Sequence, residues 1–181
     1  MEHNTPSIKA FYIGALLHDA GKIGIKEHIL NKPAALSQSE FQEMQRHPVI
    51  GAEIIKNVKM LKDGDSIILH HHERFDGGGY PQGIKEGAIP EGARIIGVAD
   101  AFDAMTSDRP YRRALTSDEA VGEMHRCSGS QFDPRIVEAF IKVLPSITLT
   151  EEDSGVLQAM QEAAATAEEP QTEPGRGEAS C

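Results

Sequence analysis

The sequence predicts an all-α fold. Apolar side chains recur at three- and four-residue spacing over residues 7–19, as they do on an amphipathic helix. The segments that begin at Ser37 and Thr116 each have the form of a capping box, in which a Ser or Thr caps a helix and a Glu three residues later reaches back. No segment shows a strand pattern, so we expect a helical bundle.

The first half of the chain divides at its glycines and prolines. The helix over 7–19 should end at His18-Asp19, because glycines follow at once, and residues 24–36 should form a connection. The first capping box predicts a helix over 38–57, and Pro48 predicts a kink or a break inside it. Asp63-Gly64-Asp65 then opens a segment that we expect to be helical through the three consecutive histidines.

The second half begins with a loop. Residues 76–92 contain six glycines and two prolines, too many breakers for a regular element. A helix should follow over 90–106, and the second capping box predicts another helix that ends near Cys127. Asp133-Pro134 is an N-cap followed by a proline at the first helical position, which predicts a last helix to about Leu144.

The negative charge gathers at the C-terminal end. The chain has 181 residues and a net charge of −10, and residues 150–181 hold eight acids against one base. This stretch is rich in Glu, Ala, Pro, Gly and Thr, a composition that cannot bury enough apolar surface to fold. We therefore expect one domain over 1–149 and an acidic, mostly disordered tail over 150–181.

Composition excludes several classes of protein. No basic run offers the positive field that duplex nucleic acid requires. The two cysteines, Cys127 and Cys181, predict no disulfide framework. No apolar run approaches the roughly 18 residues of a membrane span, and the first residues lack the form of a signal peptide. We expect a soluble, cytoplasmic protein.

Histidines and carboxylates supply the chemistry. His18-Asp19 ends a helix, His47 lies on the next one, His70-His71-His72-Glu73 precedes the glycine-rich loop, and Asp100 lies in an apolar stretch. A buried carboxylate such as Asp100 needs a cation or strong hydrogen bonds, whereas any single histidine could be an ordinary surface or core residue. Together these groups suit iron, manganese or zinc, and a carboxylate can bridge two such ions for displacement at phosphorus.

Longer motifs carry a resemblance. Residues 18–24, His-Asp-Ala-Gly-Lys-Ile-Gly, resemble the signature of the HD superfamily of metal-dependent phosphohydrolases. Residues 71–81, His-His-Glu-Arg-Phe-Asp-Gly-Gly-Gly-Tyr-Pro, are similar to the signature of its HD-GYP branch. Residues 98–106, 107–112 and 131–134 continue the pattern in order, so that the resemblance covers about residues 10–145. We call residues 76–92 the GYP loop.

The resemblance implies a role for each matching residue. Asp19 would bridge two divalent ions, iron or manganese, and would share the catalytic role with Lys22, which would face a substrate phosphate. Glu73 would orient a ligand histidine, and His70 would be a neighbour rather than a ligand. Tyr80, Arg109 and Arg112 would contact the substrate. The full ligand set implied is His18, Asp19, His47, His71, His72 and Asp100.

The implied function is a phosphodiesterase that hydrolyses cyclic di-GMP to pGpG and GMP by attack of a metal-bridging hydroxide. Family members carry one more ligand histidine on a helix upstream of the HD pair. This chain has 17 residues before His18, and His3 is too close to match. We therefore expect a shortened domain that follows a receiver or sensor domain in a longer product, with dimerisation as a further expectation. The alternatives are a signalling module that binds a cyclic dinucleotide or a protein without catalysis, and a phosphohydrolase for another nucleotide.

Overall fold

The computed structural model describes residues 8–59, 61–108 and 113–146. Within these ranges the backbone forms helices, and an isolated bridge joins Ser128 to Phe132 with no strand, so the all-α prediction is confirmed. The chain divides into two compact units, Met1–Val143 and Leu144–Cys181. The predicted tail lies outside the described residues, so its disorder and the boundary at residue 149 stay predictions.

The first half is built from short helices joined by tight turns. Both halves of the first capping box form, and Ser37 caps α3. The predicted helix over 38–57 is broken before Pro48, which lies in the first turn of α4, where its missing N–H costs no hydrogen bond. The expected connection over 24–36 contains one helical turn, too short for periodicity to reveal. The elements are α1 (Ile8–Leu17), η1 (Ala20–Gly24), α2 (Glu27–Leu30), α3 (Gln38–Met44), α4 (His47–Lys56), η2 (Lys62–Gly64) and α5 (Asp65–His70).

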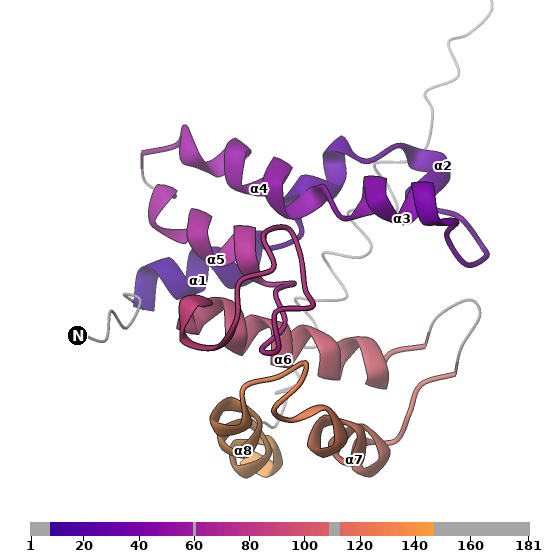
Figure 1. The fold of residues 1–181 in the computed structure, drawn as a ribbon, viewed down its shortest axis with the longest axis vertical. Helices are drawn as coiled ribbons and strands as arrows, with labels where there is room; N and C mark the ends of the chain where they lie inside the picture. The colour runs from indigo at the N-terminus through magenta and orange to yellow at the C-terminus, as the bar shows by residue number, and fades with distance from the viewer. Residues whose placement is uncertain (1–7, 60, 109–112, 147–181) are drawn as a thin grey trace, which may run out of the picture. The chain divides into compact units, whose positions relative to one another are not determined.

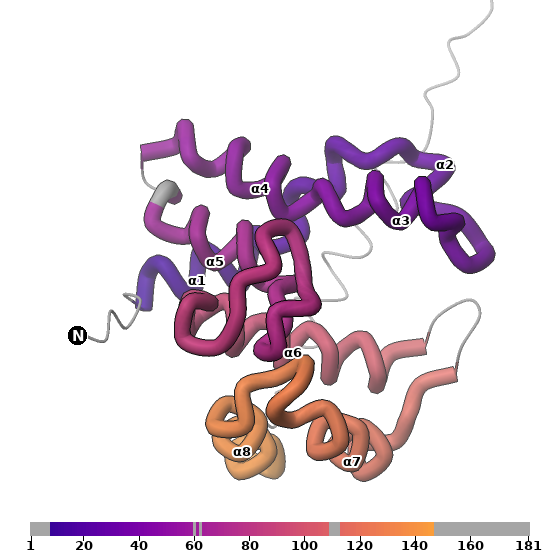
Figure 2. Tube along the Cα trace, viewed as in Figure 1, coloured from indigo at the N-terminus to yellow at the C-terminus, as the bar shows by residue number. Residues whose placement is uncertain are grey.

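The second half begins at the GYP loop and contains three longer helices. The loop prediction holds, apart from one 3-10 turn, η3 (Glu86–Ala88). The helices are α6 (Glu91–Thr106), α7 (Ser117–Cys127), capped by Thr116, and α8 (Pro134–Val143), and η4 (Leu144–Ser146) follows. In Figure 1, α6 lies between α1, α4 and α5 on one side and α7 and α8 on the other, and Figure 2 traces the same order along the chain.

Three apolar clusters hold these helices together. One joins α1, α5 and α6 around Ile67 and Ile96, and a second joins α1, α4 and α5 around Ile55 and Ile68. The third packs α6 against α7 and α8 around Met124. Helix α5 contributes to the first and second clusters, and α6 contributes to the first and third. The segments that adjoin these two helices are therefore fixed relative to α1 and α4.

The packing face of α1 overlaps only in part with the apolar stripe that periodicity predicts. Phe11 and Ala15 of that stripe pack against the first cluster, whereas Ile8 and Tyr12 are 89% and 64% exposed. The buried residues of the helix are Ala10, Ile13 and Gly14. A Cβ on Gly14 would lie 2.6 Å from Ile67, so small residues let α1 approach α5 closely. No helix in the described ranges is long and apolar enough to cross a membrane.

Candidate metal centre

Four of the predicted ligands converge on one point. Asp19, His47, His71 and His72 each offer a ligand atom, and these atoms all lie within 4.8 Å of one another. The residues come from three places in the chain: the turn after α1, the first position of α4 and the turn after α5. Because α5 ends at His70, the pair His71 and His72 lies just beyond the helix rather than on it.

Backbone carbonyls fix the orientation of two buried imidazoles. Nδ1 of His47 lies 2.8 Å from the carbonyl of Met44, and Nδ1 of His71 lies 2.7 Å from the carbonyl of Ile68. A carbonyl only accepts, so each Nδ1 carries the proton and each Nε2 presents a lone pair. These two Nε2 atoms face each other at 3.4 Å. Two lone pairs that face each other repel, so this arrangement is favourable when a cation lies between the two nitrogen atoms.

Burial keeps these imidazoles in the neutral form. It lowers the pKa of His47, lowers that of His71 to about 4, and lowers that of His72 to about 2, because each charged form is desolvated. The neutral form of histidine is the one that ligates a metal. Burial alone would raise the pKa of Asp19, but the hydrogen bond from Lys22, together with the charges of Lys22, His18 and His47, outweighs burial and lowers that pKa. The cluster therefore combines neutral imidazoles with an ionised carboxylate at neutral pH, and this donor set fits a divalent transition metal.

The other predicted residues of the first motif flank Asp19. Nε2 of His18 lies 3.6 Å from Oδ2 of Asp19 and 3.8 Å from Oδ1 of Asp100, while its Nδ1 is 2.8 Å from the carbonyl of Ala15. The ammonium of Lys22 is 2.6 Å from Oδ2 of Asp19. Burial raises the pKa of Asp100, and the nearby charge of Asp19 adds a smaller effect in the same direction. Asp19 thus joins the three histidines of the cluster to the His18–Asp100 pair.

Gly21 explains why η1 and α4 come together. A Cβ at this position would lie 1.9 Å from the carbonyl oxygen of His47 and 2.5 Å from the backbone nitrogen of Gly51. Only glycine permits that approach, and it brings the turn that carries Asp19 against the start of α4. As a result, Oδ1 of Asp19 lies 3.4 Å from Nε2 of His47.

The GYP loop folds back onto the histidine turn in the same way. A Cβ on Gly79 would lie 2.3 Å from the backbone nitrogen of Arg74 and 2.6 Å from the carbonyl oxygen of His72. The next residue, Tyr80, stacks on His72 with ring centroids 4.8 Å apart and an interplanar angle of 28°. The tyrosine therefore forms a wall beside the imidazole of His72, and burial raises the pKa of the Tyr80 hydroxyl.

Glu73 differs from its expected role. Its described hydrogen bonds do not reach a histidine: Oε1 accepts from the backbone N–H groups of Gln82 and Gly83 at 2.7 and 3.1 Å. The buried carboxylate thus anchors the middle of the GYP loop. His70 lies outside the cluster, with its Nδ1 bonded to the carbonyl of Ser66 and its Nε2 3.2 Å from Gln82. Arg109 and Arg112 lie outside the described residues.

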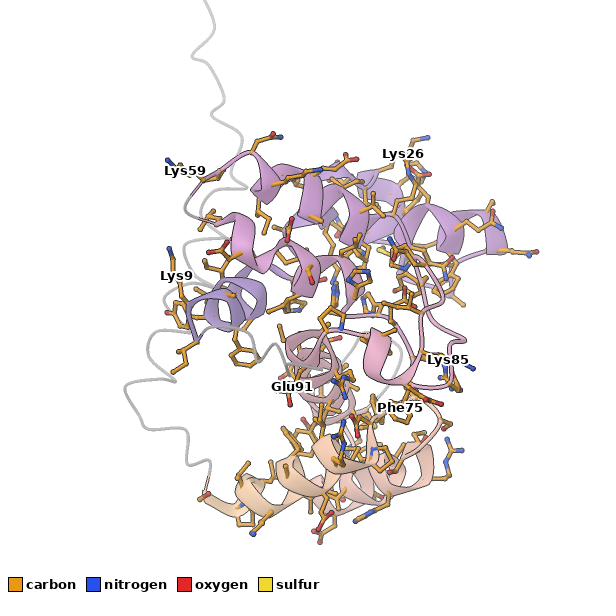
Figure 3. All side chains as sticks on the ribbon, turned by 60° about the vertical axis from the view of Figure 1, so that its left-hand side comes forward. Lys9, Lys26, Lys59, Phe75, Lys85 and Glu91 are labelled. Atoms are coloured by element: carbon orange, nitrogen blue, oxygen red, sulfur yellow. The ribbon has the colours of Figure 1, made fainter. Side chains whose placement is uncertain are left out.

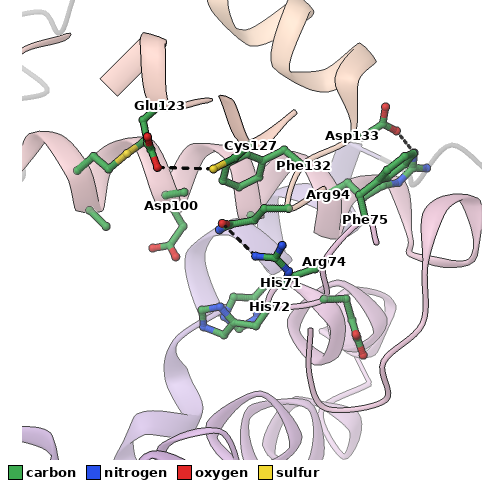
Figure 4. Close-up of a pocket in the computed structure, with 16 residues that line it drawn as sticks. His71, His72, Arg74, Phe75, Arg94, Asp100, Glu123, Cys127, Phe132 and Asp133 are labelled. Atoms are coloured by element: carbon green, nitrogen blue, oxygen red, sulfur yellow. Dashed lines mark hydrogen bonds and ion pairs between the residues drawn. The ribbon is translucent and has the colours of Figure 1, made fainter. Parts of the chain in front are cut away.

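Two cavities open beside the centre, and His72 and Asp100 line both. One of about 540 Å³ is also lined by Asp19, Lys22 and Tyr80, and we call it the main cleft. Its wall includes Lys32, which the motifs did not single out because it lies in the connection between α2 and α3. The other cavity, about 320 Å³, lies between α6, α7 and the histidine turn, where Arg74, Glu123 and Gln131 line it (Figure 4).

A comparison with protein families agrees with this geometry. A profile of the HD domain family matches residues 1–136. The chain belongs to the HD domain family. Its relatives place it in the HD-GYP branch of that family. A cyclic di-GMP phosphodiesterase of Thermotoga maritima is 48% identical over 136 residues, which are 74% of this chain and 37% of that protein. The cyclic di-GMP phosphodiesterase response regulator RpfG of Xanthomonas campestris is 44% identical, over 75% of this chain and 36% of its own length.

Other HD-GYP relatives differ in substrate. A 3′3′-cGAMP-specific phosphodiesterase of Vibrio cholerae is 36% identical, over 77% of this chain and 32% of its own length. Among solved structures, an HD-GYP protein of Bdellovibrio bacteriovorus shares the fold with a TM-score of 0.60 at 21% identity, over 75% of this chain and 43% of its own. The chain spans about a third of the length of the curated relatives that it matches.

Proposed function

We propose that this HD-GYP domain is a metal-dependent phosphodiesterase that hydrolyses cyclic di-GMP to pGpG and GMP. The observation that carries the proposal is the pair of unprotonated Nε2 atoms of His47 and His71, 3.4 Å apart beside an ionised Asp19. That arrangement is unfavourable without a cation and well suited to one. The cyclic dinucleotide activity of the relatives supports the substrate class.

The residues divide into two ligand groups. His47, His71 and His72 would hold one ion with Asp19, and His18 and Asp100 would hold a second, with Asp19 shared between them. We propose iron or manganese, the ions that the family resemblance implies, and the mixed imidazole and carboxylate donors suit both. When bound, the ions supply positive charge at the phosphoryl oxygens and lower the pKa of a coordinated water.

The protein's own groups then position the substrate. The ammonium of Lys22 donates to Asp19, and beside the metal centre it would bind an oxygen of the scissile phosphate. Tyr80, stacked on His72, gives the cleft an aromatic surface against which a base or ribose can pack. Arg109 and Arg112 are proposed as further substrate contacts.

The test compares neighbouring histidines. Purified wild-type protein, loaded with Fe²⁺ or Mn²⁺, should contain about two metals per chain and convert cyclic di-GMP to pGpG. His71→Ala should lose metal and activity, because it removes a ligand from the cluster. His70→Ala is the matched control and should retain both, because His70 lies outside that cluster. Asp19→Ala should abolish metal loading and hydrolysis together.

Each outcome discriminates between functions. Retained turnover in Asp19→Ala would sink the site assignment. Cyclic di-GMP binding without turnover in the loaded wild-type protein would favour a non-catalytic signalling module instead. Hydrolysis rates on a substrate panel of cyclic di-GMP, 3′3′-cGAMP and a linear nucleotide show which of these the protein prefers. The upstream receiver or sensor domain and the homodimer stay predictions.

A further inference from the structure

The main cleft contains a second lysine that the proposed catalysis does not use. Lys32 lies in the connection between α2 and α3, and it lines the same cavity as Asp19, Lys22 and His72. Its side chain is 30% exposed, so it is partly covered by its neighbours. Among the lysines in the described ranges, two line this cavity, Lys22 and Lys32.

A helix cap holds Lys32 in place. Its Nζ donates to Oε2 of Glu40 at 2.6 Å, and the same oxygen accepts from the backbone N–H of Ser37 at 2.7 Å. This carboxylate is therefore the acceptor of the capping box of α3, and the cap fixes it. The pairing lowers the pKa of Glu40 to about 2, so Glu40 is ionised at neutral pH. An ammonium has three N–H donors, and Glu40 accepts from one of them.

The cleft wall around Lys32 is linked to the GYP loop. Phe41 follows Glu40 on α3, and its ring contacts Tyr80 edge-on, with centroids 6.4 Å apart. Tyr80 in turn stacks on His72. The α3 cap, the tyrosine and the ligand histidine thus form one connected wall, and Lys32 has a defined position relative to the metal centre.

The chemistry of a cyclic dinucleotide supplies a role for this lysine. Its ring contains two phosphodiesters, each with one negative charge, and a metal centre cleaves one at a time. While one phosphate lies at the centre beside Lys22, the other must lie elsewhere in the same cleft. We propose that Lys32 binds this second, uncut phosphate and so selects a cyclic dinucleotide over a substrate with a single phosphodiester.

This inference rests on the proposed function, and the experiment separates the two. The equilibrium Kd for cyclic di-GMP and the kinetics of its hydrolysis are measured for wild type and for Lys32→Met, which keeps the aliphatic stem. Hydrolysis of bis(4-nitrophenyl) phosphate, which has one phosphodiester, is measured beside them. Lys59→Met is the matched control, because Lys59 is exposed, points outward from the molecule (Figure 3) and is not among the residues that line the cleft. A thermal unfolding midpoint and the metal content show that each variant is folded and loaded.

Lys32→Met should raise the Kd and KM for cyclic di-GMP roughly tenfold, as expected for one charge-assisted hydrogen bond at a partly exposed site. Its kcat/KM for the single phosphodiester should stay within about twofold of wild type, since that substrate has no second phosphate. Lys32→Arg should recover most of the affinity, because it restores the positive charge.

Three results would overturn the inference. An unchanged Kd for cyclic di-GMP in folded Lys32→Met would show that Lys32 does not bind the phosphate. The proposed phosphodiesterase function would still stand. An equal loss on both substrates assigns Lys32 to the structure of the cleft rather than to the second phosphate. If wild type neither binds nor hydrolyses cyclic di-GMP, the proposed function fails and the inference falls with it.

Discussion

Gly79→Ala tests whether the GYP loop must lie directly on the histidine turn. A Cβ at this position would be 2.3 Å from the backbone nitrogen of Arg74 and 2.6 Å from both Cα of Glu73 and the carbonyl oxygen of His72. Ordinary van der Waals contact begins at 3.4 Å, so the loop must move by about 1 Å. All three obstacles are backbone atoms, and no side-chain rotation can relieve the clash.

The displacement should reduce both catalysis and stability. Tyr80 follows Gly79 directly, so its stacking on His72 would be lost or altered. A misplacement of about 1 Å at a site can cost about 100-fold in rate, and we expect a loss of that order in kcat/KM for cyclic di-GMP. Overpacking typically costs about 1–3 kcal/mol, which denaturant unfolding would measure.

Gly87→Ala is the matched control, because it adds the same methyl group to the same loop with nothing within 4 Å of the new Cβ. Steady-state kinetics on metal-loaded protein should show near-wild-type activity for this variant. If Gly79→Ala proved as active as Gly87→Ala, with its metal content and unfolding midpoint unchanged, the argument from close backbone approach would be wrong.

Three further predictions concern stability and metal. Asp133 is 1% exposed and is paired with Arg94 across α6 and α8, so Asp133→Ala should lower the free energy of unfolding by about 3–5 kcal/mol in urea titrations. Arg135→Ala, which removes a 75% exposed partner of the same carboxylate, should cost at most about 1 kcal/mol, and a larger loss would contradict the assignment. Glu73→Ala should speed amide hydrogen exchange at residues 82–83, whose N–H groups lose their acceptor, whereas Glu73→Gln, which keeps Oε1, should not. Adding Mn²⁺ at 100 times its Kd should stabilise wild type by about 2.7 kcal/mol and EDTA should reverse this, while an identical response in His71→Ala would exclude the cluster as the binding site.

Local sequence signals determined most of the helical fold. The two capping boxes placed the starts of α3 and α7, because the groups that satisfy the first N–H groups of a helix lie within four residues of each other. Pro48 placed the break before α4 for an equally local reason. Periodicity gave the extent of α1 but only part of its buried face, since that face depends on how closely Gly14 lets α5 approach.

The ligand residues were also visible in the sequence, through motifs whose residue types suit a divalent metal. Only the tertiary structure decided how they meet. The lone pairs of His47 and His71 face each other because carbonyls three residues earlier hold their Nδ1 atoms, and because α4 and α5 pack together. The placement of Lys32 in the cleft and the anchoring of the GYP loop by Glu73 likewise depend on contacts between segments distant in the chain. Spacing along a sequence carries no information about such distances, since they are set by packing between elements.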